Sequence, residues 1–317
     1  MTRYFYRPLL ALAIGVAAVW MTLGIRHRPT NRRTESATQS RAPQLPASQP
    51  RSNWPEPRPL DLETLDGDEI LFQTYRLKRL TKKVSLDDWP KEHGRAMSLE
   101  VSYATLVHNG EVMEIFDNGL YHPMGNSIDV GLFPLLGVHA KQLVVAQTIW
   151  RGGAYWIVNF APRAQVIYRS SEWGVGTDEI SAVDLDHDGV EEIFQRVTAF
   201  YSLQDKLAIA QIPLPEVIFK YDAQAARYLP ANTLHKDYLL RDLEESRASI
   251  SEPSKYNFNH LAGVLAVTLR LIYAGEEKKG WEFFDRAYQL PDKEEIKARV
   301  LAILKDEPVY RFIYRQR

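Results

Sequence analysis

The chain has 317 residues, of which 45% are apolar and 25% charged, and its formal net charge is −1. This composition excludes a wholly disordered chain, a collagen-like repeat and a polytopic membrane protein, and the near-neutral charge argues against nucleic acid as a partner. The absence of cysteine excludes disulfides, thiolate metal sites, a cysteine nucleophile and a lipid-modified cysteine.

An uncharged apolar run of 17 residues, Leu9–Ile25, follows Arg3 and Arg7 near the N-terminus. At about 1.5 Å per residue it extends roughly 25 Å, close to the thickness of the hydrocarbon core of a bilayer. We expect residues 1–25 to form either a retained membrane anchor or a cleaved secretory signal. The lack of an Ala-x-Ala cleavage site after the run favours the anchor, which makes the membrane a partner through Leu9–Ile25.

The orientation of this segment rests on two opposing arguments. The arginines that follow the run would hold the body in the cytoplasm under the positive-inside rule. The cation motif described below, however, suits a calcium-rich exterior. We therefore expect the body to lie outside the cytoplasm, in a periplasmic or extracellular space, with secretion after signal cleavage as the alternative.

Residues 26–58 have the composition of a linker. They contain six prolines, and seven arginines against two glutamates give this stretch a formal charge of +5. Such a segment buries too little apolar surface to fold, so we expect an extended, disordered tether. It either lies on anionic lipid headgroups or acts as a plain spacer.

Residues 59–230 are predicted to form a β-rich domain. Short apolar or alternating runs are separated by turn dipeptides, of which Asp66-Gly67, Asn109-Gly110 and Gly152-Gly153 are examples. The runs predicted as strands extend through residues 190–201 (VEEIFQRVTAFY) and 207–212 (LAIAQI). The connections are too short for parallel crossovers, so we expect a mainly antiparallel meander similar to a propeller blade but too short for a closed propeller.

Residues 231–317 are predicted to form a small helical subdomain, which makes the fold class α+β. The first expected helix is capped by Asn232 or Thr233, and its buried face runs from Leu234 to Leu243. The second covers Phe258–Ala274 and ends at Gly275, and the third covers Glu276–Leu290. The fourth opens with a capping box at Asp292 and ends before Pro308.

The segment 275–291 resembles the second half of a tetratricopeptide repeat, because Gly280, Phe284 and Ala287 precede a proline at similar spacing. The resemblance implies a peptide-binding helical hairpin. A peptide-binding solenoid needs several stacked repeats, so the alternative is a helical hairpin that packs on the sheet.

The run Asp184–Glu192 reads DLDHDGVEE and carries the strongest chemical signal. Carboxylates at alternating positions suit Ca²⁺, a hard cation that takes six to eight oxygen ligands, and Gly189 permits the sharp turn. The bidentate acid of an EF-hand would fall on Gln195, and both flanks are predicted strands, which argues against an EF-hand. His187 is expected to face solvent.

This loop resembles the calcium loop of integrin-type FG-GAP and VCBS repeats, which lies between β-strands of a blade. The resemblance implies side-chain ligands and one carbonyl ligand, namely Asp184, Asp186, Asp188, Glu192 and the carbonyl of Val190. The ion would be structural, because the carboxylates repel one another without it. The alternative is an acidic hairpin turn that binds no metal.

Other candidate residues carry weaker signals. A joint metal or catalytic site is one reading of His93, His108, His122 and His139, and isolated structural roles are the other. Paired acids are one reading of Asp87-Asp88, and an exposed loop is the other. Carbohydrate or partner binding is one reading of Trp150, Tyr155 and Trp156, and core packing is the other.

No nucleophile elbow, metalloprotease helix or P-loop occurs, so no catalytic residue is predicted. We expect a membrane-tethered or secreted, calcium-stabilised module that binds a protein or a carbohydrate, or acts as a scaffold, in the cell envelope. The alternative is an envelope hydrolase or transferase whose site is assembled from residues distant in sequence. Residues 59–317 hold 30 basic and 38 acidic residues, so the acidic body suits a cation-binding module.

Overall fold

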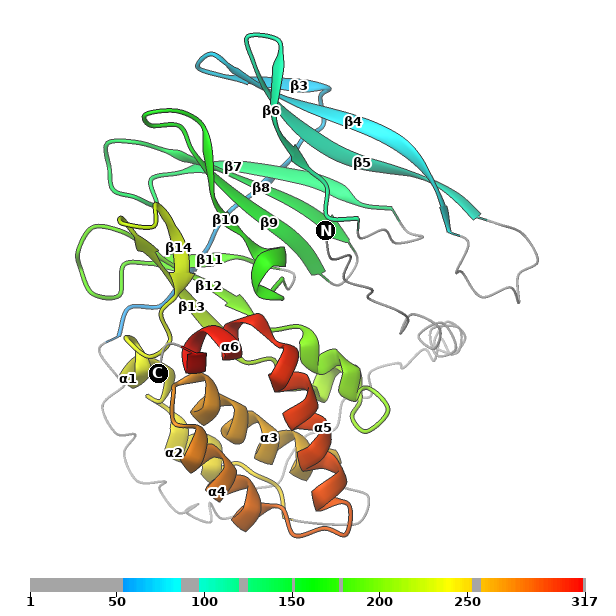
Figure 1. The fold of residues 1–317 in the computed structure, drawn as a ribbon, viewed down its shortest axis with the longest axis vertical. Helices are drawn as coiled ribbons and strands as arrows, with labels where there is room; N and C mark the ends of the chain where they lie inside the picture. The colour runs from blue at the N-terminus through cyan, green and yellow to red at the C-terminus, as the bar shows by residue number, and fades with distance from the viewer. Residues whose placement is uncertain are drawn as a thin grey trace, which may run out of the picture. The chain divides into compact units, whose positions relative to one another are not determined.

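The computed structural model describes residues 54–86, 97–119, 125–149, 152–176, 179–252 and 258–315. Together these residues form one compact unit. The predicted membrane segment and most of the predicted linker lie outside the described residues. The fold class is α+β, with antiparallel sheets followed by a C-terminal helical region (Figure 1).

The strands form three antiparallel sheets. The first has the order β3-β4-β5-β6 and comprises β3 (Glu69–Phe72), β4 (Tyr75–Leu86), β5 (Met97–His108) and β6 (Glu111–Phe116). The second has the order β10-β9-β8-β7-β2 and comprises β10 (Gln165–Arg169), β9 (Gly152–Asn159), β8 (Gln142–Ile149), β7 (Ser127–Phe133) and β2 (Glu63–Thr64). The third has the order β1-β11-β12-β13-β14 and comprises β1 (Arg58–Pro59), β11 (Ser181–Val183), β12 (Glu192–Arg196), β13 (Glu216–Asp222) and β14 (Arg227–Pro230).

The second sheet is buried on both faces. Successive side chains of a strand point to opposite faces of the sheet, so each strand can contribute residues to two cores. On β8, Val144 and Ala146 enter the large core shared with the third sheet and the helices. Leu143 and Val145 enter a second core shared with the first sheet. A strand with core on both faces needs a continuous apolar run, which explains the sequence LVVA in β8.

The turn predictions have mixed outcomes. Asn109 and Gly110 both have positive φ (52° and 85°) and join β5 to β6, as expected for a tight hairpin turn. The turn predicted at Gly152-Gly153 is wrong: both glycines belong to β9, where Gly152 pairs with Ile149 and Gly153 with Thr148. Close contact explains the glycine at 153, since a Cβ there would lie 3.3 Å from the carbonyl oxygen of Gln147.

The predicted strand over 207–212 is also wrong, because Ile209–Gln211 form a 3₁₀ turn, η4. The end of the preceding predicted strand is another 3₁₀ turn, η3 (Ala199–Leu203). Leu203, Leu207 and Ile212 are buried in the large core, so these apolar residues pack without belonging to a sheet. A third such turn, η2 (Ser170–Trp173), follows β10.

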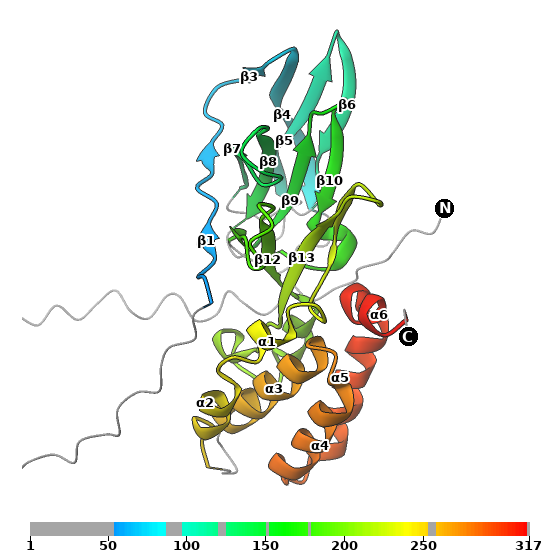
Figure 2. The same cartoon turned by 90° about the vertical axis from the view of Figure 1, so that its left-hand side faces the viewer.

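Within the described residues, six helices follow β14. They are α1 (Lys236–Leu239), α2 (Leu243–Ala248), α3 (Phe258–Tyr273), α4 (Glu277–Ala287), α5 (Lys293–Asp306) and α6 (Pro308–Arg315). They lie below β12 and β13 in Figure 2. The apolar faces of α2 to α6 join the large core, whereas Tyr238 and Leu239 of α1 belong to a smaller cluster with Phe194 and Ile218. The predicted boundary between residues 230 and 231 coincides with the end of β14.

Three helix predictions need correction. The first predicted helix is two short helices, α1 and α2, and Leu234 is 75% exposed instead of buried. The expected capping box at Asp292 does not form, because its carboxylate accepts a hydrogen bond from the Tyr288 hydroxyl instead of capping α5. Pro308 begins a helix rather than following the last one: α6 has its proline in the first turn, where the missing N–H costs no hydrogen bond.

The predictions for α3 and α4 are confirmed within a few residues. Gly275 has φ 82° and follows α3, and the N–H of Glu276 bonds the carbonyl of Leu271, which closes the helix end. Gly280 lies where α4 meets α3, and a Cβ there would be 2.8 Å from Ile272 Cγ1.

Candidate cation site

The acidic loop connects β11 to β12, which form an antiparallel pair in which Val183 faces Glu192. Both flanking segments are therefore strands, as the sequence predicts. Leu185 is buried inside the loop, while His187 is exposed, also as predicted. Gly189 has φ 86°, a conformation that a residue with a side chain seldom adopts.

Backbone hydrogen bonds hold the loop in a tight turn. The carboxylate of Asp184 accepts hydrogen bonds from the N–H groups of Asp188 (3.1 Å) and Gly189 (3.0 Å). Asp188 accepts one from the N–H of Val190 at 2.9 Å. Val190, the predicted carbonyl ligand, therefore lies in the turn with its N–H already bonded. The alternating acids of the loop thus also form the hydrogen bonds that hold its turn.

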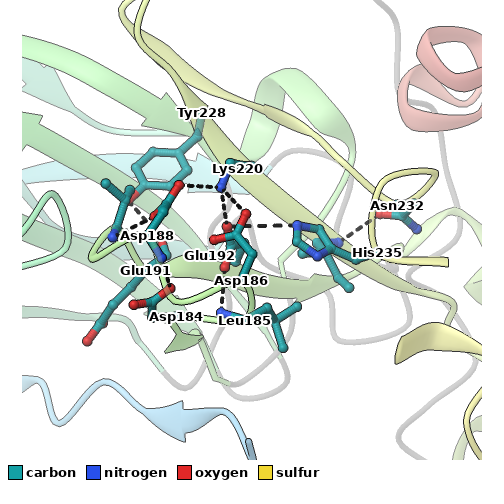
Figure 3. A network of polar contacts seen from close by, with 12 residues as sticks. Asp184, Leu185, Asp186, Asp188, Glu191, Glu192, Lys220, Tyr228, Asn232 and His235 are labelled. Atoms are coloured by element: carbon teal, nitrogen blue, oxygen red, sulfur yellow. Dashed lines mark hydrogen bonds and ion pairs between the residues drawn. The ribbon is translucent and has the colours of Figure 1, made fainter. Parts of the chain in front are cut away.

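The remaining carboxylate oxygens converge on one cation, the ammonium of Lys220 (Figure 3). Lys220 Nζ lies 2.6 Å from Asp186 Oδ2, 2.7 Å from Asp188 Oδ2 and 3.1 Å from Glu192 Oε1. Lys220 belongs to β13, which pairs with β12, so the sheet itself brings the ammonium over the loop. The sequence reasoning missed this residue.

Glu192 is the most buried acid of the site. It begins β12 and its side chain is fully buried. Its second oxygen, Oε2, accepts a hydrogen bond of 2.8 Å from the N–H of Leu185. One carboxylate therefore ties the start of the loop to the start of β12 and presents its other oxygen to the cation position.

The pKa values reflect burial and charge pairing. The hydrogen bonds from Lys220 hold the pKa of Asp188 below its usual range. Burial raises the pKa of Glu192, although the Leu185 N–H and Lys220 both act to lower it. Burial acts to lower the pKa of Lys220, but hydrogen bonds to the carboxylates outweigh it and raise that pKa above its usual range. Lys220 therefore remains an ammonium at neutral pH.

His235 lies on the inner side of the same cluster. Its side chain is 8% exposed, and Nε2 lies 3.8 Å from Glu192 Oε1. This nitrogen has no hydrogen-bond partner among the described residues. Burial lowers the pKa of His235, which favours the neutral imidazole that can bind a metal. The sequence reasoning did not single out His235.

The chain segment that carries His235 is fixed to β13 by Asn232. The side-chain oxygen of Asn232, Oδ1, accepts a hydrogen bond from the N–H of Ile218 at 2.8 Å, and its side-chain Nδ2 donates to the Glu216 carbonyl at 3.0 Å. Asn232 thus serves as a bridge in the turn after β14 and not as the helix cap expected from the sequence. As a result, the imidazole is placed rigidly beside β12.

The donor atoms fit a cation. Ligand atoms of Asp184, Asp186 and Asp188 lie within 4.8 Å of one another, as do those of Asp186, Glu192 and His235. The four carboxylates and the one ammonium leave a formal charge of −3. The residues present therefore suit a divalent ion, provided that the ammonium of Lys220 moves aside.

The other candidate residues do not form a second site among the described residues. His108 stacks on Tyr75, and His139 is exposed. Tyr155 and Trp156 are 2% and 4% exposed, so they belong to the core and not to a binding surface. The remaining candidates lie outside the described residues: Asp87, Asp88, His93, His122 and Trp150.

No helix within the described ranges combines the length and apolar character needed to cross a bilayer. Comparisons with family models, with curated proteins and with solved structures found no match to this chain.

Proposed function

We propose that this chain is a calcium-stabilised binding or scaffolding module of the cell envelope, attached to the membrane through Leu9–Ile25 or secreted. The observation that carries the proposal is the convergence of Asp186, Asp188 and Glu192 on a single cation position. Beside it lies His235, whose Nε2 has no hydrogen-bond partner among the described residues.

The residues that would hold Ca²⁺ are the acids of the loop together with Glu192. The ion would supply positive charge that offsets the repulsion among these carboxylates. Lys220 neutralises only one of four negative charges, so the remaining negative charge would attract a divalent ion. The oxygen-rich donor set favours Ca²⁺, whereas the imidazole would favour a first-row transition metal.

The position of the site suits a structural role. The β11–β12 loop, Lys220 on β13 and His235 before α1 come from three separate parts of the chain. A cation held there would fix the loop against the sheet and against the start of the helical region. The rest of the body would then present a stable surface to a protein or carbohydrate partner.

Calorimetry of the purified full chain tests the proposal. A dissociation constant of roughly 10⁻⁴ to 10⁻³ M predicts that 10 mM Ca²⁺ adds about 1.4 to 2.7 kcal/mol to the unfolding free energy. The melting temperature should rise by roughly 3 to 10 °C. Asp186→Asn should reduce this rise, and Asp66→Asn, at an exposed acid beside β3, should leave it unchanged.

Mg²⁺ at the same concentration controls for ionic strength. A larger rise with Zn²⁺ than with Ca²⁺ would contradict the choice of ion and assign the site to a transition metal. A melting temperature that no divalent ion raises would contradict the cation site altogether.

A further inference from the structure

A cavity of about 310 Å³ lies at the other end of β12 from the cation site. Arg196, the last residue of β12, and Glu216, the first residue of β13, line it together with Arg241 and Arg270. Its apolar wall comes from the side chains of Leu214, Leu239 and Leu269. Its volume is at the small end of the range for ligand pockets in proteins.

Two of the arginines are held in place by their own contacts. The Arg241 guanidinium lies 3.8 Å from the centre of the Tyr238 ring and donates to the Tyr238 carbonyl at 2.8 Å. Arg270 donates to the Leu239 carbonyl and to Ser246 Oγ. Asp242 is the nearest acid to both, at 3.5 Å from Arg241 and 3.8 Å from Arg270.

Asp242 is half-exposed, so water screens its charge and it compensates the partly buried guanidinium of Arg270 only in part. Burial acts to lower the pKa of Arg270. The wall of the cavity formed by Arg241 and Arg270 therefore carries positive charge, which suits recognition of a carboxylate.

The opposite wall holds a pair of opposite charges that do not meet. Arg196 and Glu216 face each other across β12 and β13. Within the described residues, neither side chain makes a hydrogen bond or an ion pair of 4.0 Å or less. Burial raises the pKa of Glu216, although Arg241, Arg196 and Arg270 act to lower it. The half-buried carboxylate of Glu216 therefore lacks a close positive partner among the described residues.

We infer that this cavity binds a small zwitterion of the α-amino acid class with an apolar side chain. The ligand carboxylate meets the guanidiniums of Arg241 and Arg270, the ligand ammonium meets Glu216, and the side chain lies against the apolar lining of Leu214, Leu239 and Leu269. A plain carboxylic acid would leave Glu216 unpaired beside a second negative charge. A plain amine would be repelled by the arginines. The inference does not depend on the cation site.

Isothermal titration of the full chain with L-leucine, L-methionine and L-phenylalanine tests this inference. Two analogues of leucine serve as matched probes: 4-methylpentanoate lacks the ammonium, and 3-methylbutylamine lacks the carboxylate. At least one amino acid should bind with a dissociation constant of 1 mM or below. If leucine binds, each of its analogues should bind at least tenfold more weakly; for another amino acid, its own deaminated and decarboxylated analogues replace them.

Variants locate the two contacts. Glu216→Gln should weaken amino-acid binding at least tenfold and tighten binding of the deaminated analogue, because the repulsion from Glu216 is removed, whereas Arg241→Met should weaken both ligands. Glu179→Gln, at an exposed acid outside the cavity lining, is the control and should change neither.

Failure of all three amino acids to bind at 10 mM would overturn the inference. Equal binding of amino acid and deaminated analogue by the wild-type chain would also overturn it, since that result describes a plain anion site. This second comparison needs no variant, so it holds even if Glu216→Gln fails to fold.

Discussion

Replacing Lys220 with methionine removes the ammonium from the acidic loop and keeps most of the aliphatic stem. The side chains of Asp186 and Asp188 are 42% and 45% exposed, so each lost ion pair costs no more than about 0.5 kcal/mol. Glu192 is fully buried, and a buried charge left without its partner costs about 3 to 5 kcal/mol.

Glu192 can reduce that cost by taking up a proton, since burial already raises its pKa. We therefore expect Lys220→Met to lower the unfolding free energy by about 2 to 3 kcal/mol in calcium-free buffer. The corresponding fall in melting temperature is roughly 4 to 12 °C. Lys206→Met, which removes one pair with the exposed Glu295, should cost less than about 1 kcal/mol.

Calcium should reduce the difference in stability between the variant and the wild-type chain. Without the ammonium, the loop keeps its four carboxylates for the ion, so Ca²⁺ should bind the variant at least tenfold more tightly than the wild-type chain, which is about 1.4 kcal/mol. Thermal unfolding at 0, 1 and 10 mM Ca²⁺ measures both effects. A variant as stable as the wild type without calcium would refute the structural role of Lys220. A calcium response no larger than that of the wild type would refute the shared cation position.

Three further comparisons of variants test the helical region. Glu307→Ala should cost about 3 kcal/mol, because the buried Glu307 carboxylate accepts hydrogen bonds from the N–H groups of Val309 and Tyr310 and from the Tyr273 hydroxyl. Glu307→Gln keeps an acceptor and the neutral form that burial favours, so urea unfolding should show a cost below about 1 kcal/mol; equal costs would contradict the capping role. Gly280→Ala should lower the unfolding free energy by about 1 to 2 kcal/mol despite its gain in helix propensity, since the new Cβ would lie 2.9 Å from the Thr268 carbonyl oxygen. Gly263→Ala should cost less, because its Cβ would lie 3.3 Å from a side-chain carbon. The opposite order of costs would contradict the close contact of α3 and α4. Hydrogen bonds from Arg299 hold the pKa of Asp205 below its usual value, so this exposed pair stabilises the fold by no more than about 1 kcal/mol above pH 4 and the contribution is lost as pH falls further. The difference between wild type and Arg299→Met should thus shrink in unfolding experiments below pH 4, and a difference that is constant to pH 2 would contradict the assignment.

The acidic loop and its flanking strands could be predicted because their determinants are local. Alternating acids with Gly189 specify the turn, and alternating apolar residues on either side specify strands. The same holds for α3, whose apolar face and Gly275 lie within one continuous segment. For such elements, the residues that determine the structure lie within the element itself.

Lys220 and His235 could not be found in this way, because their roles depend on pairing between distant segments. The register that sets Ile193 opposite Phe219 also places Lys220 beside Glu192, and only knowledge of that register gives the charge pair meaning. Tertiary packing likewise overrides local pattern at 207–212, where apolar residues enter the core from a 3₁₀ turn.

The ammonium of Lys220 has a consequence for how fast and how tightly any ion can be bound. A group tethered to β13 occupies the cation position at a fixed effective concentration, so an ion binds only during the fraction of time in which the lysine is displaced. If that fraction is about 1%, the apparent affinity is about a hundredfold weaker than that of the bare loop. If the loop binds calcium as proposed, substitutions along β13 that alter the freedom of Lys220 would shift the concentration at which the ion binds without changing a single ligand.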